Sequence, residues 1–158
     1  MRHLSRARGL TLIELMVGLT ISAFLLMAAA PFFGDYIRNS RLREAGNALL
    51  SEALFAQSEA IKRNGTVRLS TSGATLQVID LSAPLPPLRE RTLPGSVTAP
   101  VATLDYGTEG RPVPFGTAGS INLSMTGEVC SDDTRCPGLR VDAGGATRLC
   151  GNHLNACD

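Results

Sequence analysis

Residues 9–34 of the chain read GLTLIELMVGLTISAFLLMAAAPFFG. Within this stretch, residues 15–34 form a run of 20 without a formal charge. As an α-helix with a rise of about 1.5 Å per residue, the run spans roughly 30 Å, which is the thickness of the hydrocarbon core of a bilayer. The stretch therefore predicts a helix that crosses a membrane.

The residues before this run are basic and polar. Residues 1–9 read MRHLSRARG and contain Arg2, Arg6 and Arg8. Because arginines that flank a spanning helix stay in the cytoplasm, we expect a cytoplasmic N-terminus, with the rest of the chain across the membrane. Without residues 1–9 the chain has 12 Lys and Arg against 14 Asp and Glu, a balance that does not indicate a general polyanion binder.

Glu14 helps to choose between interpretations of the apolar run. A secretory signal peptide has an apolar core of about 7–15 residues, which is shorter than this run, although the alanines at 28–30 imitate its cleavage site. A plain membrane anchor fits the length. Both leave Glu14 unexplained, because a carboxylate in a spanning segment costs about 2.5–3.5 kcal/mol at the bilayer centre and less near the edge. We therefore expect Glu14 to have a function or a partner.

A third interpretation gives Glu14 that function. Residues 9–15, GLTLIEL, resemble the G-F-T-L-I-E-L signal of type IV pilins and type II secretion pseudopilins, with Leu10 in place of the usual Phe. The resemblance implies that a prepilin peptidase cuts between Gly9 and Leu10, that Leu10 is then N-methylated, and that Glu14 is the fifth residue of the mature chain. Gly9 suits this cut, because glycine leaves the backbone at the scissile bond unhindered and flexible.

The physical chemistry of Glu14 agrees with that resemblance. The cut would free an α-amino group, whose reference pKa is roughly 7.7–8. In an apolar filament core, this cation and the Glu14 carboxylate of a neighbouring subunit would neutralise each other, although neither is tolerable there alone. The implied partners are other pilins or pseudopilins, the prepilin peptidase and an assembly platform of the bacterial inner membrane. The head would be periplasmic before it enters a pilus or pseudopilus.

Helical periodicity continues beyond the apolar run, over residues 35–64. Apolar residues recur on one face at spacings of three and four, and Leu50, Leu54 and Ile61 widen that face. Charged residues such as Glu52 and Glu59 are expected on the other faces. The apolar face is predicted to pack against a globular head, and it consists of Leu42, Ala45, Leu49, Ala53, Ala56 and Ala60.

Two local signals bear on the continuity and the end of this helix. Pro31 is expected to kink it or to cause a local loss of helix over residues 30–34, so that it adapts to a crowded filament core. Asn64-Gly65 is a stop signal, preceded by the basic Lys62 and Arg63. One helix is therefore predicted over about residues 10–64, with a transmembrane part at 10–34 and an amphipathic part at 35–64.

From residue 65 onward the composition predicts strands and turns. Residues 66–71 and 74–80 alternate as a hairpin around Ser72-Gly73, and 139–142 and 147–150 flank Gly144-Gly145 as a second hairpin. Segments near 89–93, 101–106 and 120–125 are further strand candidates. The predicted fold class is α+β: a long N-terminal helix packed on a mostly antiparallel head of residues 65–158.

The four cysteines are Cys130, Cys136, Cys150 and Cys157, all within the last 29 residues. An even number beyond a membrane-crossing segment indicates two disulfides in an oxidising compartment. Zinc is the rival interpretation, but no C-x-x-C pair occurs, and we expect neither a metal nor a cofactor. Of three possible pairings, Cys130–Cys136 with Cys150–Cys157 is favoured because short loops close most easily.

Residues at the end of the helix indicate which group of pilins and pseudopilins the chain resembles. Residues 56–64, AQSEAIKRN, resemble the A-R-S-E-A-I-K-R-N stretch of the GspH/FimT group of minor pilins and pseudopilins. That group often carries G-R-x-R followed by Cys near its C-terminus. Here residues 145–150 read GATRLC, so that Ala146 replaces the first arginine and Arg148 keeps the second.

The arginine motif suggests an alternative function. In some FimT-like minor pilins it binds DNA during natural transformation, and Arg135, Arg140 and Arg148 are the candidate contacts in this chain. Several arginines are needed for useful phosphate affinity, and nearby aspartates oppose a positive field. A structural filament subunit is therefore the preferred function, with DNA binding as the alternative.

No catalytic constellation is apparent in the sequence. The two histidines are His3 and His153, and the sequence contains no G-x-S-x-G, H-E-x-x-H or P-loop motif. The chain is therefore predicted not to be an enzyme.

Overall fold

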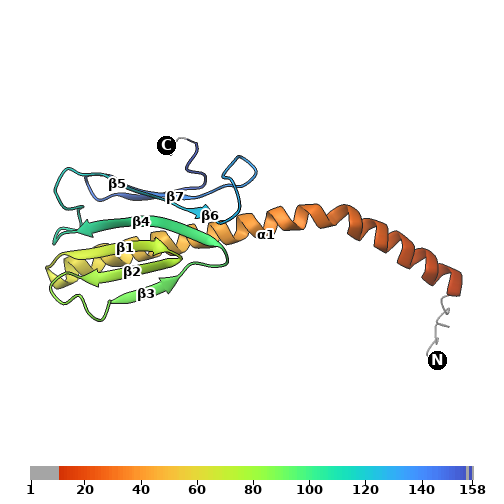
Figure 1. The fold of residues 1–158 in the computed structure, drawn as a ribbon, viewed down its shortest axis with the longest axis horizontal. Coiled ribbons are helices and arrows are strands. Elements are labelled where there is room, and N and C mark those ends of the chain that lie inside the picture. Colours follow the sequence, from red (N-terminus) through yellow and green to blue (C-terminus); the bar gives the residue numbers. More distant parts are fainter. Residues whose placement is uncertain (1–10, 156, 158) are drawn as a thin grey trace, which may run out of the picture. The chain divides into compact units, whose positions relative to one another are not determined.

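The computed structural model describes residues 11–155 and 157, and it divides into two compact units, Met1–Tyr36 and Ile37–Asp158. One helix, α1 (Leu12–Arg63), belongs to both units (Figure 1). The second unit, here called the head, also contains all eight strands assigned in the described residues. The predicted α+β class is confirmed.

In the first unit, α1 has apolar side chains on all sides. The segment Leu12–Ala29 has a mean hydropathy of 2.2 over 18 residues, and none of it is buried. By length and composition it can cross a membrane. The expected loss of helix over residues 30–34 is wrong, because α1 is continuous through Pro31. A proline removes one backbone hydrogen bond, but its fixed φ near −65° remains compatible with a helix.

In the head, α1 ends where the sequence predicts. Asn64 has a φ of 50°, in the left-handed region. The Asn64 N–H donates to Ile61 O at 3.2 Å, and the Gly65 N–H donates to Ala60 O at 3.1 Å. This pair of bonds is a Schellman motif, which satisfies carbonyls that the last helical turn leaves free.

The strands form two antiparallel sheets. The larger sheet has the order β3-β2-β1-β4-β6 and the smaller one has the order β5-β7-β8. The strands are β1 (Val67–Gly73), β2 (Thr75–Asp80), β3 (Arg89–Thr92), β4 (Val97–Tyr106), β5 (Gly119–Asn122), β6 (Ser124–Met125), β7 (Gly138–Val141) and β8 (Thr147–Cys150).

Both predicted hairpins are present. In the first, Ser72 pairs with Thr75, so that the turn residues are Gly73 and Ala74, one position later than expected. Gly73 has a φ of 58°, a conformation that glycine adopts without steric cost. In the second, Val141 pairs with Thr147 across a loop that contains Gly144-Gly145, as predicted.

The segment 120–125 is not the single strand that the sequence predicts. It forms β5 in the smaller sheet and β6 in the larger sheet, with the buried Leu123 between them. The Leu123 N–H donates to Pro137 O at 2.9 Å instead of joining a ladder. The chain thus passes from one sheet to the other at Leu123. The predicted strand at 101–106 is confirmed, but β4 begins earlier, at Val97.

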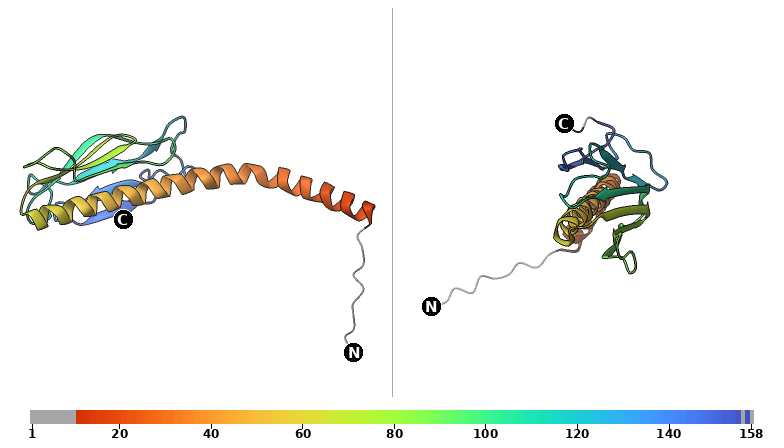
Figure 2. Two further views of the ribbon diagram at one scale, coloured as in Figure 1. Left: turned by 90° about the horizontal axis from the view of Figure 1, so that it is seen from below. Right: turned by 90° about the vertical axis from the view of Figure 1, so that its left-hand side faces the viewer.

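The head half of α1 packs against both sheets (Figure 2). Leu54 and Ile61 do not widen its buried face as predicted, because they are 47% and 55% exposed. Glu52 and Glu59 are buried instead, at 1% and 7% exposure. The predicted apolar face is confirmed, since all six of its members are fully buried: Leu42, Ala45, Leu49, Ala53, Ala56 and Ala60.

Candidate functional site

The start of α1 is a capping box built from Thr11 and Glu14. The backbone N–H of Thr11 donates to Glu14 Oε2 at 2.8 Å, and the Thr11 hydroxyl donates to the same oxygen at 2.7 Å. In return, the Glu14 N–H donates to Thr11 Oγ1 at 3.3 Å. Thr11 is therefore the N-cap of the helix, and Glu14 is its N3 residue.

This geometry shows how the helix tolerates a carboxylate at the edge of the apolar segment. Glu14 Oε2 accepts two short hydrogen bonds within its own chain, and among residues 11–155 no donor reaches Oε1. The carboxylate is exposed on the helix surface, so Oε1 is available to a second donor. Gly9 and Leu10, the predicted cleavage and methylation positions, lie outside the described residues.

Thr11 is a site residue that the sequence reasoning missed. The letters T-L-I-E at residues 11–14 match the S/T-x-x-E pattern of a capping box, and they directly precede the apolar run. The sequence therefore contained the signal for Thr11 as the N-cap. The other hydroxyls of the segment are satisfied by the helix itself, since Thr20 donates to Met16 O at 3.1 Å and Ser22 donates to Gly18 O at 2.8 Å.

The two cysteine pairs each close a short loop in the head. Cys130 is joined to Cys136 and Cys150 to Cys157, which is the pairing that the sequence favours. Sulfur and nitrogen atoms of Cys130, Cys136 and His153 lie within 4.8 Å of one another. Those residues do not fit a metal in this state, because both sulfurs belong to the disulfide and neither is a thiolate.

Asn39 on α1 holds the first of these loops. Its Nδ2 donates to Asp133 O at 2.7 Å, and its Oδ1 accepts from the Arg135 N–H at 2.9 Å. On the other side, Asn152 donates to Ser131 O at 3.0 Å. The loop therefore links α1 to the C-terminal tail.

The structure brings two of the three candidate DNA-contacting arginines together. Arg140 on β7 and Arg148 on β8 are directly opposite each other in the ladder. Arg140 donates to Asn122 Oδ1 at 2.6 Å, whereas Arg148 is exposed and has no ion pair among the described residues. Both line an open hollow of about 510 Å³ that Ser120 also borders. Arg135 lines a different hollow.

Carboxylates on α1 and β2 form ion pairs inside the head. Glu59 Oε2 lies 2.7 Å from Arg63 Nε, and this hydrogen bond lowers the pKa of Glu59. Hydrogen bonds from the Ser82 hydroxyl and N–H lower the pKa of Asp80. Glu52 is the most buried of these carboxylates, and its Oε1 lies 3.1 Å from Arg91 Nε. Arg63 Nη1 also lies 3.3 Å from Asp80 Oδ2, so this pair joins α1 to β2, and the Glu52–Arg91 pair joins α1 to β3.

Gln57 joins α1 to two loops at the far end of the head. Its Nε2 donates to Gly110 O at 2.6 Å and to Gly145 O at 3.0 Å. A Cβ on Gly145 would lie 2.7 Å from Gly110 O, so that glycine is required for this close approach. The loop after β4 and the β7–β8 hairpin are thereby held against each other.

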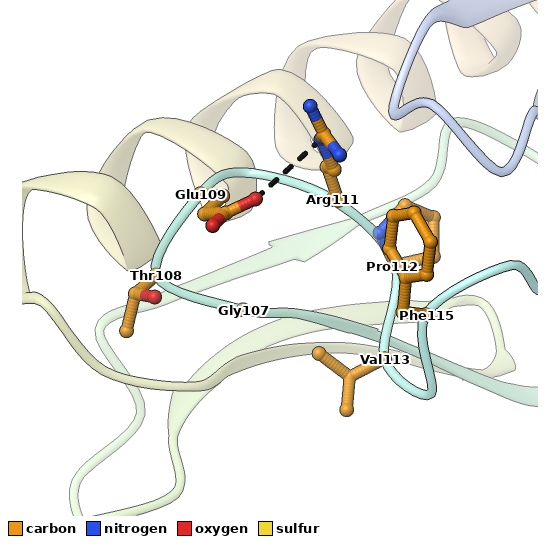
Figure 3. A pocket seen from close by; sticks show the side chains of 7 residues that line it. All are labelled: Gly107, Thr108, Glu109, Arg111, Pro112, Val113 and Phe115. Carbon is orange, nitrogen blue, oxygen red and sulfur yellow. Dashed lines mark ion pairs between the residues drawn. The ribbon is translucent and has the colours of Figure 1, made fainter.

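The loop after β4 also forms a hollow of about 350 Å³ (Figure 3). Its apolar lining includes Pro112, Val113 and Phe115. Arg111 Nε lies 3.6 Å from Glu109 Oε2, and its guanidinium carbon lies 5.5 Å from the centre of the Phe115 ring. The hollow thus combines an apolar floor with a charged rim.

Comparisons with known proteins agree with this arrangement. A model of the prokaryotic N-terminal methylation motif matches residues 4–30, and a model of the type II transport protein GspH matches residues 45–145. No curated relative matches the sequence.

Solved structures of the type IV minor pilin FimU from Pseudomonas aeruginosa are similar to this chain. One, in space group P65, has 20% identity and a TM-score of 0.55, and the match covers 68% of this chain and 90% of that one. A second, in space group P21, has 19% identity and a TM-score of 0.59, with coverages of 72% and 91%.

The long helix and antiparallel head define the chain as a pilin-like protein with an apolar N-terminal segment. Because the GspH model covers more than half of its residues, the chain belongs to the GspH family. The family and fold are those of structural pilins, which assemble with other pilins in a filament.

Proposed function

We propose that the chain is made as an inner-membrane precursor, cut by a prepilin peptidase between Gly9 and Leu10, and built into a type II secretion pseudopilus or type IV pilus as a minor structural subunit. The apolar segment Leu12–Ala29 and the methylation motif at residues 4–30 support processing and membrane insertion. Cleavage leaves Leu10 as the first residue and places its methylated amine directly before Thr11.

The observation that carries this proposal is the capping box. Thr11 fixes the Glu14 carboxylate through Oε2 and leaves Oε1 exposed. In the filament, the amine of a neighbouring subunit binds that second oxygen. An ion pair in an apolar surrounding is strongly favoured over either charge alone, so correct stacking of subunits is selected.

The remaining parts of the chain have supporting roles in this proposal. The basic residues 1–9 stay in the cytoplasm, where the peptidase and the assembly platform act, and the disulfide-bonded head is periplasmic. Pro31 removes the N–H that would bind Met27 O, so the continuous helix lacks one backbone hydrogen bond at this point.

The test replaces Glu14 by Ala in the full-length chain, with Thr11→Ala as a second variant. We expect Glu14→Ala to be cut normally, as judged by the mass of the mature chain, but to be lost from sheared filaments by at least about tenfold. Thr11→Ala should have a smaller effect, because it removes the positioning of Glu14 and not the charge. A Glu14→Ala variant that enters filaments at the unmodified level contradicts the pairing.

The alternative function, DNA binding, is favoured by a single observation. Arg140 and Arg148 are like charges directly opposite each other, an arrangement that is destabilising unless an anion neutralises it. We expect the full-length chain in detergent to shift duplex DNA at low salt, and Arg148→Ala to weaken that shift. No shift, or one that Arg148→Ala leaves unchanged, removes this function.

A further inference from the structure

A histidine lies beside the first disulfide of the head. The sulfur atoms of Cys130 and Cys136 and a ring nitrogen of His153 all lie within 4.8 Å of one another. When the disulfide is open, both cysteines are thiols. Two thiolates and one imidazole are ligands that zinc prefers, and a zinc site with three protein ligands takes a water molecule in the fourth position. The open form of this disulfide therefore contains three zinc ligands in one place.

The spacing of the three ligand atoms is close to that of a tetrahedral site. Bonds of about 2.3 Å to sulfur and about 2.1 Å to nitrogen place the ligand atoms roughly 3.5–3.8 Å apart. The ring nitrogen of His153 is already within 4.8 Å of both sulfurs. Once the bond between the sulfurs is broken, small movements of the three side chains are sufficient, and the backbone can stay where it is.

The backbone around the three ligands is held by hydrogen bonds that do not need the disulfide. Asn39 on α1 and Asn152 in the tail bind the loop from two sides. The His153 N–H donates to the carbonyl oxygen of Cys136 at 2.7 Å, and Cys136 is fully buried in the core of the head. A Cβ on Gly138 would lie 2.8 Å from His153 Cβ, so the histidine packs closely on β7. Opening the disulfide therefore leaves the three ligands together.

The second disulfide has no such arrangement. Within the part of the chain that the structure describes, no histidine or carboxylate joins Cys150 and Cys157 to complete a set of three ligands. The two cysteine pairs thus differ in one chemical respect, the presence of an imidazole beside the sulfurs. Cys150 and Cys157 are for this reason an internal control for metal binding.

We propose that Cys130, Cys136 and His153 bind Zn²⁺ whenever the disulfide between the two cysteines is not formed. A newly made chain carries both cysteines as thiols. An existing disulfide is opened by a dithiol, which supplies two electrons and two protons and itself becomes a disulfide. Zinc then displaces the two thiol protons as it binds. The metal joins the loop to His153 in the tail, so the loop has two alternative crosslinks, one covalent and one through zinc.

The test measures thiol alkylation in the reduced full-length chain in detergent. The disulfides are opened with a phosphine, which is removed without oxygen, and modification by iodoacetamide is followed at each cysteine by mass spectrometry. We expect equimolar Zn²⁺ to slow the modification of Cys130 and Cys136 by at least about tenfold, because a metal-bound thiolate is not a free nucleophile. Cys150 and Cys157 should react at an unchanged rate. Protection of all four cysteines, or of none, overturns the site.

Replacing His153 by Ala tests the third ligand. The affinity is measured by titrating the reduced chain with Co²⁺, whose sulfur-to-metal charge-transfer absorption reports thiolate binding, and by displacing it with Zn²⁺. We expect His153→Ala to weaken binding of both metals by at least about tenfold, a loss that even an outer-shell change produces. The matched control is Leu154→Ala at the next position, which is 54% exposed and should bind as the unmodified chain does. Unchanged affinity in His153→Ala overturns the assignment.

The fold of the reduced head is measured in the same samples. The near-ultraviolet circular dichroism of the buried Tyr106 shows whether the head is folded. We expect the reduced chain with zinc to keep the signal of the oxidised chain, because the metal constrains the same loop. A reduced chain that lacks this signal and does not regain it with zinc overturns the proposal. The oxidised chain, in which both sulfurs are blocked, should bind neither metal at this place.

Discussion

Replacing Leu49 by Ala tests which face of α1 holds the head together. Leu49 is fully buried, and its neighbours on the same helix face are mostly alanines, such as Ala45, Ala53 and Ala56. Leu→Ala changes in protein cores cost about 2.7–5 kcal/mol, and the cost rises with the cavity that remains. Since alanine side chains are too short to fill the space, we expect a loss in the upper part of that range, about 3.5–5 kcal/mol.

Thermal unfolding of the full-length chain in detergent measures this loss. The near-ultraviolet circular dichroism of the buried Tyr106 reports on the head. For a domain of this size, we expect the midpoint to fall by about 10–20 °C. The control is Leu54→Ala on the same helix, which is 47% exposed and should cost less than about 1 kcal/mol. Equal shifts for the two variants would refute the packing described for α1.

Two further predictions concern the head. The pKa values of Glu59 and Asp80 are lowered in the folded state, so their stabilisation is complete above the unfolded-state values of about 4 and is lost as the pH falls through the lower folded-state values. The thermal unfolding midpoint should therefore fall when the pH is lowered below about 4. This fall should be smaller in Asp80→Asn, which lacks one of the two carboxylates. Separately, Gly119→Ala should lower the thermal unfolding midpoint, because its Cβ would lie 2.5 Å from the side chain of Leu104. Gly151→Ala should leave the midpoint unchanged, because no neighbouring atom lies within 4 Å of the added Cβ.

The helix and its two ends were the most predictable parts of the fold. Their signals are local: hydrophobic spacing, a run without charge, and the Asn64-Gly65 stop. The hairpin at β7–β8 was predictable for the same reason, since its turn residues lie between two alternating segments. The capping box at Thr11 was equally local, and the sequence pattern contained it.

The sequence predictions were wrong where the burial of a helix residue depends on strands that are distant in the chain. Leu54 and Ile61 fit the apolar spacing of α1, but no strand of the described head covers them. Glu52 was expected to be exposed, yet it is buried because Arg89 and Arg91 of β3 approach it. Neither outcome is encoded within one turn of helix, because each depends on which strands fold over the helix.

The sequence by itself determined that this chain has an apolar segment long enough to span a membrane, a carboxylate at its edge, and a long helix ahead of a β-rich, disulfide-bonded head. Those features follow from spacing, charge and length, which act over neighbouring residues. Only the tertiary structure decided the division of the strands between two sheets and the burial of Glu52 beside Arg89 and Arg91 of β3. These depend on long-range packing, in which segments far apart in sequence must exclude water together.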